Sequence, residues 1–364
     1  MLNLLWIIGN GFDRNLGLAT DYRSFLKNRY FKDGVQNKYR DELVKRVEGF
    51  SPERASELWC DLENLLGRAS AFYEDDEELF HETFENIQDE FLDYVFRESS
   101  RMPVELPQEA VQEFRASISS FYTRLTAVDV LKGLPALMST SEDVTVHVLV
   151  LNYTNTVNRF WDEIGKDQPF GKLIVGTTPK FFYQGTLLHL HGEINDGGTA
   201  TNIIFGVSDS DQITSPVYSS KVDFQELWVK EKKNYGIYGN TKTAEMSELI
   251  AKADSICIYG CSLGESDGYI WRQVADRLSD SACRLYIFDY GLPDRSTVAA
   301  RAYQKRRRDL ARRFYEVANV AAEDEKSISD RFSRLSQLRS LISFTCLIDW
   351  TACVSYRRFR VDVS

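Results

Sequence analysis

The fold is decided by a stretch at the start of the chain, Asn3-Leu4-Leu5-Trp6-Ile7-Ile8-Gly9-Asn10-Gly11. It is a short apolar run that contains β-branched residues and ends at a glycine. Such a run predicts a buried strand that opens onto a glycine loop.

Two later runs have the same character. Thr145–Leu151 is a nearly continuous β-branched run, and Ser255–Tyr259 again ends at a glycine, Gly260. Helical patterns over Thr243–Ala253 and Tyr269–Leu278 separate the later strands. Because strands alternate with helices and no hairpin turn is evident, we predict an α/β fold with a Rossmann-type parallel sheet and helices on both faces. Shorter strands are expected at Leu173–Val175, Thr186–Leu190, Asn202–Phe205, Cys283–Phe288 and Ser343–Leu347.

A large helical insertion is predicted after the first strand. Phe80, Phe84, Ile87, Phe91 and Val95 are spaced by three or four and share one helix face. Ser51-Pro52 suits a helix start, and Met102–Pro107 breaks the helical pattern. The predicted domains are a core of residues 1–21 and 137–290, a helical insertion of residues 22–136, and a C-terminal extension of helix and edge strand over residues 291–364.

Composition narrows the class of protein. The hydrophobic fraction of 43% suffices for a packed core, and the net charge of −10 disfavours binding to DNA or anionic membranes. The 6 cysteines form no C-x-x-C pair, which is typical of a reducing compartment. The first apolar run lacks a basic flank and is too short to span a bilayer, so we expect a soluble, cytoplasmic protein without membrane contact.

One basic run departs from the acidic average. Lys305-Arg306-Arg307-Arg308 is followed by Arg312 and Arg313. An exposed cationic helix face explains the run, and a contact with phosphate or nucleic acid is the functional alternative.

Four polar segments follow predicted strands, at the edge where open parallel sheets bind ligands. The first is Gly9-Asn10-Gly11-Phe12-Asp13, followed by Gly17. Glycines here would let backbone N–H groups approach a pyrophosphate. The third glycine of the dinucleotide fingerprint is replaced by Arg14, and a tight turn is the structural alternative.

The second and third segments offer an amide and an imidazole. Asn152 follows a buried strand and could hold a ribose hydroxyl or orient a water, or the Asn152–Thr156 segment could simply cap a helix. His189 and His191 lie on one face of a strand. No carboxylate or cysteine set has ligand spacing, so no metal is expected. A general base or a satisfied buried histidine remain the alternatives.

The fourth segment is Gly260–Asp267, whose small residues and carboxylate suit a sugar and phosphate. Gly260-x-Ser262-x-Gly264 also matches a hydrolase nucleophile elbow. No histidine follows position 191, however, so the chain order of that class fails.

These segments, in this order, resemble the AbiH family of phage abortive-infection proteins. The resemblance rests on Ile7–Asp13 with Gly17-Leu18-x-Thr20-x-Tyr22, on Trp59-x-x-Leu62-Glu63, and on the Asn152–Thr156, His189–Gly192 and Gly260–Asp267 segments. It touches most of the chain up to about residue 267 and implies a role in abortive infection.

A more distant similarity is to sirtuin-like NAD-binding domains. Gly9, Gly11 and Gly17 fall at sirtuin glycines, Asn152 and His191 at the sirtuin Asn and His, and Gly260 and Ser262 at the last loop. Two positions depart from it: Asp13 replaces a small residue, and Thr154 replaces an Asp that helps hold the nicotinamide end.

The resemblance implies cleavage of the N-glycosidic bond of NAD, or of a related nucleotide, with NAD as substrate. His191 is then the general base and Asn152 orients water or ribose. The nucleotide-binding residues are Gly9, Asn10, Gly11, Asp13, Gly17, Thr154, Gly260, Ser262 and Asp267. Asp13, Glu63 or Asp267 would face the cationic ring. A phage-derived trigger is expected and a homo-oligomer stays open. The rival functions are nucleotide sensing without turnover, and action on nucleic acid.

Overall fold

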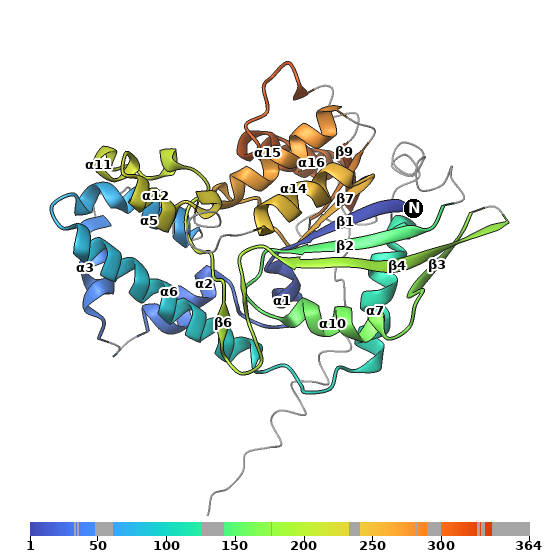
Figure 1. Cartoon of the computed structure of the whole chain (residues 1–364), viewed down its shortest axis with the longest axis horizontal. Helices are drawn as coiled ribbons and strands as arrows, with labels where there is room; N and C mark the ends of the chain where they lie inside the picture. The colour runs from blue at the N-terminus through green and yellow to red at the C-terminus, as the bar shows by residue number, and fades with distance from the viewer. Residues whose placement is uncertain are drawn as a thin grey trace, which may run out of the picture.

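A computed structural model places a seven-stranded sheet at the centre of the protein, in the order β3-β4-β2-β1-β7-β8-β9 (Figure 1). The structure describes residues 1–32, 34, 36–47, 61–124, 142–175, 177–232, 241–280, 283–289, 300–325, 328 and 332–336. The strands are β1 (Leu2–Ile8), β2 (Val144–Val150), β3 (Gly171–Val175), β4 (Thr178–His189), β7 (Ser255–Tyr259), β8 (Arg284–Asp289) and β9 (Phe332–Ser336).

The sheet is mixed. β1 lies in the middle and pairs in parallel with both β2 and β7. β3 and β4, however, form an antiparallel pair in which Val175 lies opposite Thr178. The prediction of an all-parallel sheet was therefore wrong at this edge. The connection between the two strands is too short for the crossover that parallel pairing requires.

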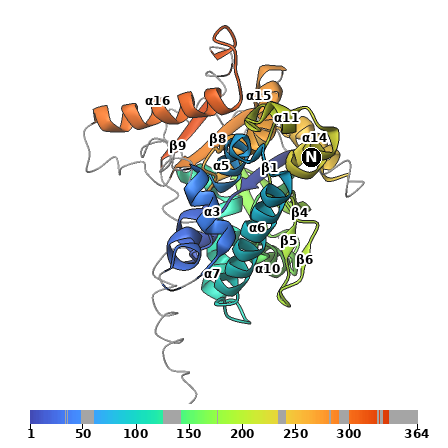
Figure 2. The same ribbon diagram turned by 90° about the vertical axis from the view of Figure 1, so that its left-hand side faces the viewer.

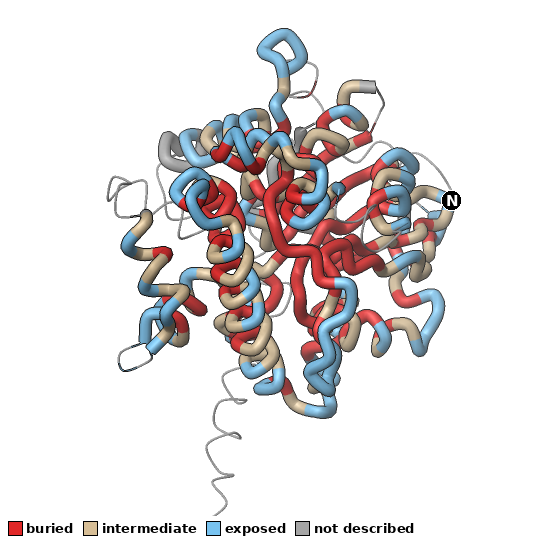
Figure 3. The backbone as a smooth tube through the Cα atoms, turned by 60° about the vertical axis from the view of Figure 1, so that its left-hand side comes forward, coloured by how far each residue is buried: buried red, intermediate tan, exposed pale blue. Residues whose placement is uncertain are grey.

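Helices cover both faces of the sheet. On one face, apolar side chains of α1 (Gly11–Asn15), α7 (Gln108–Ser119) and α10 (Thr156–Gly165) pack against the strands. On the other face, α14 (Lys242–Lys252), α15 (Gly268–Asp280) and α16 (Ala300–Val317) do the same. Figure 3 shows the resulting buried layer enclosed by helices whose outer sides are exposed.

The segment between β1 and β2 is helical in its described parts. Its remaining helices are α2 (Tyr22–Phe25), η1 (Leu26–Tyr30), α3 (Lys38–Val47), α5 (Leu62–Ala69), η2 (Ser70–Tyr73), α6 (Glu77–Ser99) and η3 (Phe121–Arg124). Phe80, Phe84, Ile87, Phe91 and Val95 are all buried on α6. They belong to a third core, beside the sheet, which also contains Trp228 of α12 (Val222–Trp228). α5, α6 and α12 lie together at one end of the molecule (Figure 1).

Not every expected element forms. The prediction of a strand over Asn202–Phe205 was wrong. Strand pairing ends one residue earlier, at β6 (Ala200–Thr201), which pairs with β5 (Glu193–Ile194). Asn202 adopts a left-handed conformation, with φ of 50°, which ends an extended strand. Short elements η4 (Ser210–Gln212) and α11 (Pro216–Ser219) follow. The predicted helix start at Ser51-Pro52 and strand at Ser343–Leu347 lie outside the described residues.

The basic run lies on α16, which projects from the body in Figure 2. Lys305, Arg306, Arg308 and Arg312 are exposed, whereas Ala311 and Phe314 are buried against the sheet side. The expected cationic helix face is therefore confirmed. None of the helices in the described part of the chain has the length and apolar character needed to cross a membrane.

Candidate functional site

The ends of the three central strands bring the predicted segments together. The Leu151 N–H donates to the Ile8 carbonyl (2.9 Å), and the Gly9 N–H donates to the Tyr259 carbonyl (2.9 Å). The residues that follow β1, β2 and β7 thus begin side by side at one edge of the sheet.

The glycine turn after β1 packs directly against the turn after β7. The Gly11 N–H donates to the Gly260 carbonyl (2.8 Å), and a Cβ at Gly11 would lie 2.4 Å from the Gly260 Cα. Gly260 has a φ of +68°, a conformation that favours glycine. These glycines are therefore required by the close approach of two backbones. We expected the N–H groups of Gly9 and Gly11 to face a pyrophosphate. Instead, they donate hydrogen bonds to the carbonyls of Tyr259 and Gly260.

A fully buried carboxylate, Asp13, joins the glycine turn to the end of β2. It accepts hydrogen bonds from the hydroxyls of Thr20 (3.0 Å), Thr154 (2.8 Å) and Thr156. Asn10 donates to the Thr20 hydroxyl (2.6 Å) and extends this network. Burial raises the pKa of Asp13, and the hydroxyl donors oppose that rise.

Asn152 is buried next to this carboxylate, with 4% of its surface exposed. Its amide lies close enough to lower the pKa of Asp13. Among the described residues, neither its Nδ2 nor its Oδ1 reaches hydrogen-bonding geometry with a partner. A buried amide left unsatisfied is unfavourable, so this side chain is suited to receive a polar group of a ligand or an ordered water.

His191 lies on the other side of the β2 end. Its Nδ1 is 3.3 Å from the Leu151 carbonyl, and its Nε2 is 3.4 Å from the Tyr269 hydroxyl and 3.3 Å from Asp267 Oδ1. Burial, followed by the nearby Lys230 ammonium, lowers the pKa of His191 to about 3. The ring is therefore neutral at pH 7. Its Nδ1–H donates to the Leu151 carbonyl, and its Nε2 retains a lone pair.

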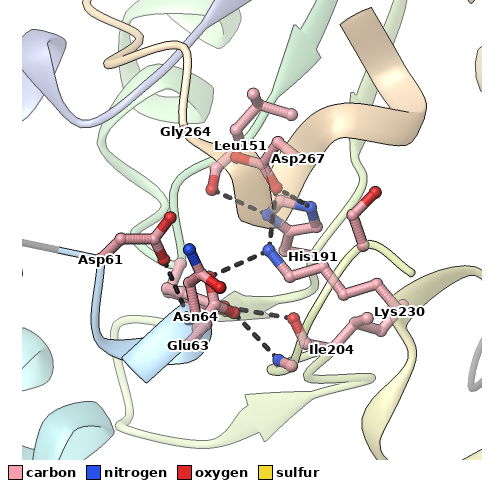
Figure 4. Close-up of polar contacts among 12 residues, drawn as sticks. Asp61, Glu63, Asn64, Leu151, His191, Ile204, Lys230, Gly264 and Asp267 are labelled. Carbon is pink, nitrogen blue, oxygen red and sulfur yellow. Dashed lines mark hydrogen bonds and ion pairs between the residues drawn. The ribbon is translucent and has the colours of Figure 1, made fainter. Parts of the chain in front are cut away.

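An ion-pair cluster lies beside His191 (Figure 4). The ammonium of Lys230, which is fully buried, contacts Asp267 Oδ1 at 2.8 Å and Glu63 Oε2 at 3.0 Å. Glu63 comes from α5 and Asp267 from η5 (Glu265–Asp267), so the cluster ties the helical insertion to the sheet. We call Glu63, Lys230 and Asp267 the buried triad.

The other oxygen of Glu63 is also in contact with donors. Oε1 accepts from the Gly206 N–H (3.0 Å) and lies 3.2 Å from the Tyr153 hydroxyl. Burial raises the pKa of Glu63 to about 7, although Lys230 opposes the rise. The same ammonium holds the pKa of Asp267 below its usual value, and the two carboxylates raise the pKa of Lys230 despite its burial.

Some predicted residues lie outside these contacts. Ser262 is exposed, and Gly17 occupies an exposed turn with φ of +79°. His189 faces a different group, the Asn158 amide and the Glu193 carboxylate. Within the described residues, no three His, Cys, Asp or Glu side chains are arranged to hold a metal ion.

The chain matches the family model for "Bacteriophage abortive infection AbiH" over residues 5–289. It belongs to the AbiH family. No curated protein matches the chain. Membership in AbiH implies a role in abortive infection of bacteriophage. The matched residues include the glycine turn, the end of β2, His191 and the buried triad.

One member of the candidate site was missed from the sequence. Lys230 follows Trp228-Val229, carries no motif, and has the appearance of a surface lysine. Glu63 and Asp267 were named as candidates, but only their shared contact with Lys230 makes them one unit. Because Glu231, Lys232 and Lys233 follow it, Lys230 looks like the start of an exposed charged run, and the sequence gives no sign that it is buried.

Proposed function

We propose that this AbiH protein acts in phage defence by cleaving the N-glycosidic bond of NAD, or of a related nucleotide. Loss of NAD would halt the infected cell. The similarity of Gly9, Gly11, Asn152 and His191 to sirtuin positions supports NAD as the substrate.

The observation that carries this proposal is the buried amide of Asn152, which lies near Asp13 but reaches hydrogen-bonding geometry with none of the described residues. It lies at the point where the segments after β1 and β2 meet. A ribose hydroxyl or an attacking water offers both a donor and an acceptor, which is what a free carboxamide requires. A satisfied structural asparagine would have found its partners within the protein.

The protein does not have to protonate the leaving group in this reaction, because nicotinamide leaves as a neutral molecule. The bond between C1′ and the pyridinium nitrogen breaks, its electron pair neutralises the ring, and water forms the new bond to C1′. One proton leaves the water. Asn152 positions the water or ribose, and His191 is the candidate general base for that proton, although a pKa of about 3 in the ligand-free protein makes it a weak base.

The negative charge needed near the cationic ring comes from the buried triad in this proposal. Asp13 is committed to three hydroxyls, whereas Asp267 keeps 19% of its side chain exposed and lies beside His191. Asp267 is therefore the carboxylate best placed to face a bound cation.

Incubation of the purified protein with NAD, followed by mass spectrometry, tests the proposal. We expect nicotinamide and ADP-ribose to form with the natural protein, and neither to form with folded His191→Ala or Asn152→Ala variants. Tight binding of NAD that is recovered unchanged would favour nucleotide sensing instead. Salt-dependent RNA or DNA binding that is lost on neutralising Lys305–Arg308 would favour action on nucleic acid.

A further inference from the structure

The buried triad contains one ammonium and two carboxylates, so its charge is not balanced when all three groups are ionised. Asp61, next to α5, adds a further carboxyl within the same surroundings and itself raises the pKa of Glu63. Among the described residues, the other groups that face the triad include Tyr153, whose hydroxyl contacts Glu63, the Gly206 N–H, and His191, whose Nε2 is 3.3 Å from Asp267 Oδ1. Tyr22 and Tyr269 also lie near these carboxylates, and burial raises the pKa of both phenols, so neither adds a charge at neutral pH. An excess negative charge in a buried place must be relieved by a proton or by a bound cation.

The geometry around Tyr153 identifies where a proton can reside. Its hydroxyl lies 3.2 Å from Glu63 Oε1 and 3.1 Å from the Ile204 carbonyl. Both oxygens are acceptors when Glu63 is ionised, and a phenol has one hydrogen to donate. If Glu63 carries a proton, it can donate to the Tyr153 oxygen while the phenol donates to the Ile204 carbonyl.

A second, independent feature points to a ligand at this place. Asn64, the next residue on α5, is 4% exposed and lies in the same cluster (Figure 4). Its Nδ2 donates to Glu265 (2.9 Å), but its Oδ1 is buried and has no hydrogen-bond partner among the described residues. An unsatisfied carbonyl oxygen beside excess carboxylates favours a cation or an N–H donor.

We propose that Glu63 is the proton-exchanging residue of the buried triad, and that it gives up its proton when a cationic ligand occupies the site. Lys230 is a positioning residue that holds Glu63 against Asp267. With Glu63 protonated, the triad carries no net charge; with Glu63 ionised, it carries one negative charge. This inference rests on the proposed function only in taking the pyridinium ring of NAD as the cation.

The coupling between cation binding and the ionisation of Glu63 predicts two effects. A cation near the triad favours the ionised form of Glu63, so its binding releases a proton when the pH is below the pKa of that carboxyl. In that range, affinity for the cation should rise by up to about tenfold per pH unit. A neutral dihydropyridine ring should show neither effect.

The first test uses the protein without ligand. Because the pKa of Glu63 is raised from 4.5 to about 7, its contribution to stability is present below pH 4.5 and is lost as the pH rises to about 7. His191 acts in the opposite sense over part of this range, so the comparison is made with Glu63→Gln: relative to that variant, the thermal midpoint of the natural protein should fall as the pH rises from 4.5 to about 7. Glu265→Gln is the matched control, because that carboxylate also contacts α5 but is partly exposed. The same change of thermal midpoint with pH in Glu63→Gln and in the natural protein would overturn the proposal.

The second test is calorimetric titration in buffers of different ionisation enthalpy with NADH and with carba-NAD, a cationic analogue whose glycosidic bond resists cleavage. Carba-NAD stands for NAD⁺ in this test, because hydrolysis of NAD⁺ would itself release a proton. Below about pH 7 we expect carba-NAD to release close to one proton, NADH none, and Glu63→Gln none with either. Binding of carba-NAD without proton release would refute the linkage while leaving the proposed function intact. Absence of carba-NAD binding would count against the proposed function, and the ligand-free stability test would still decide the role of Glu63.

Discussion

The Thr154 hydroxyl donates to the Asp13 carboxylate at 2.8 Å and so joins the end of β2 to the glycine turn after β1. The carboxylate comes from the turn and its hydroxyl partner from the segment after β2, so this one contact joins two parts of the site that lie far apart in the chain.

Thr154→Val should therefore destabilise the protein by about 1–3 kcal/mol, because it removes one donor from a buried carboxylate. Thr145→Val is the matched control, since Thr145 lies on β2, shortly before Thr154 in the chain, but is only partly buried. Urea unfolding of both variants measures the difference. Equal stability of the two variants would show that Asp13 does not depend on the Thr154 hydroxyl.

Lys230→Met should be far more harmful, since it leaves Glu63 and Asp267 buried without their cation. We expect a loss of about 3–5 kcal/mol in the free energy of unfolding, partly restored when Glu63→Gln is added. Lys221→Met is the control: its pair with Glu77 lies at the surface, where a loss within about 1 kcal/mol is expected. Similar losses for the two lysine variants would mean that the triad is not a stabilising unit.

Gly11→Ala tests the contact between the two turns. The added methyl group would lie 2.4 Å from the Gly260 Cα, so the neighbouring backbone must shift. We expect this shift to lower the free energy of unfolding by about 1–3 kcal/mol or more. Gly17→Ala provides a comparison, because a Cβ there meets no described atom within 4 Å and the strain of its positive φ alone should be about 1–2 kcal/mol. If the two turns are packed as described, Gly17→Ala destabilises the protein less than Gly11→Ala does.

His191 should remain neutral through the physiological range. Burial and Lys230 lower the pKa of this imidazole from 6.5 to about 3, so the folded protein takes up its proton less readily than the unfolded chain. Its stabilising effect is present above pH 6.5 and is lost as the pH falls toward 3. Nitrogen-15 NMR of labelled histidine should show the Nδ1–H tautomer from about pH 5 to pH 8. A titration of this ring near its ordinary pKa would contradict the assignment.

Secondary-structure elements that are marked by a repeating pattern of apolar residues could be predicted from the sequence. The three central strands, β1, β2 and β7, were predictable because each is a continuous apolar run, and α6 because its phenylalanines repeat at helical spacing. The β3–β4 hairpin and the left-handed Asn202 were missed, since both depend on local backbone geometry that residue type marks weakly.

The candidate site was predictable where its residues follow strands. Parallel pairing brings Asn152 and the glycine turn together whatever the side chains are. Lys230 could not be predicted, because its role arises from contacts with Glu63 and Asp267, which lie far from it in the chain. For the same reason, the use of the Gly9 and Gly11 N–H groups by the β7 end became visible only in three dimensions.

The most direct test of the account is a crystal structure with carba-NAD, an analogue whose ribose ring oxygen is replaced by carbon so that the glycosidic bond resists cleavage. The account predicts that the nicotinamide riboside end lies against Asn152 and His191, with the pyridinium ring toward Asp267 and a ligand atom hydrogen-bonded to the Asn152 amide. A ligand bound elsewhere, with the Asn152 amide still unpartnered, would contradict it.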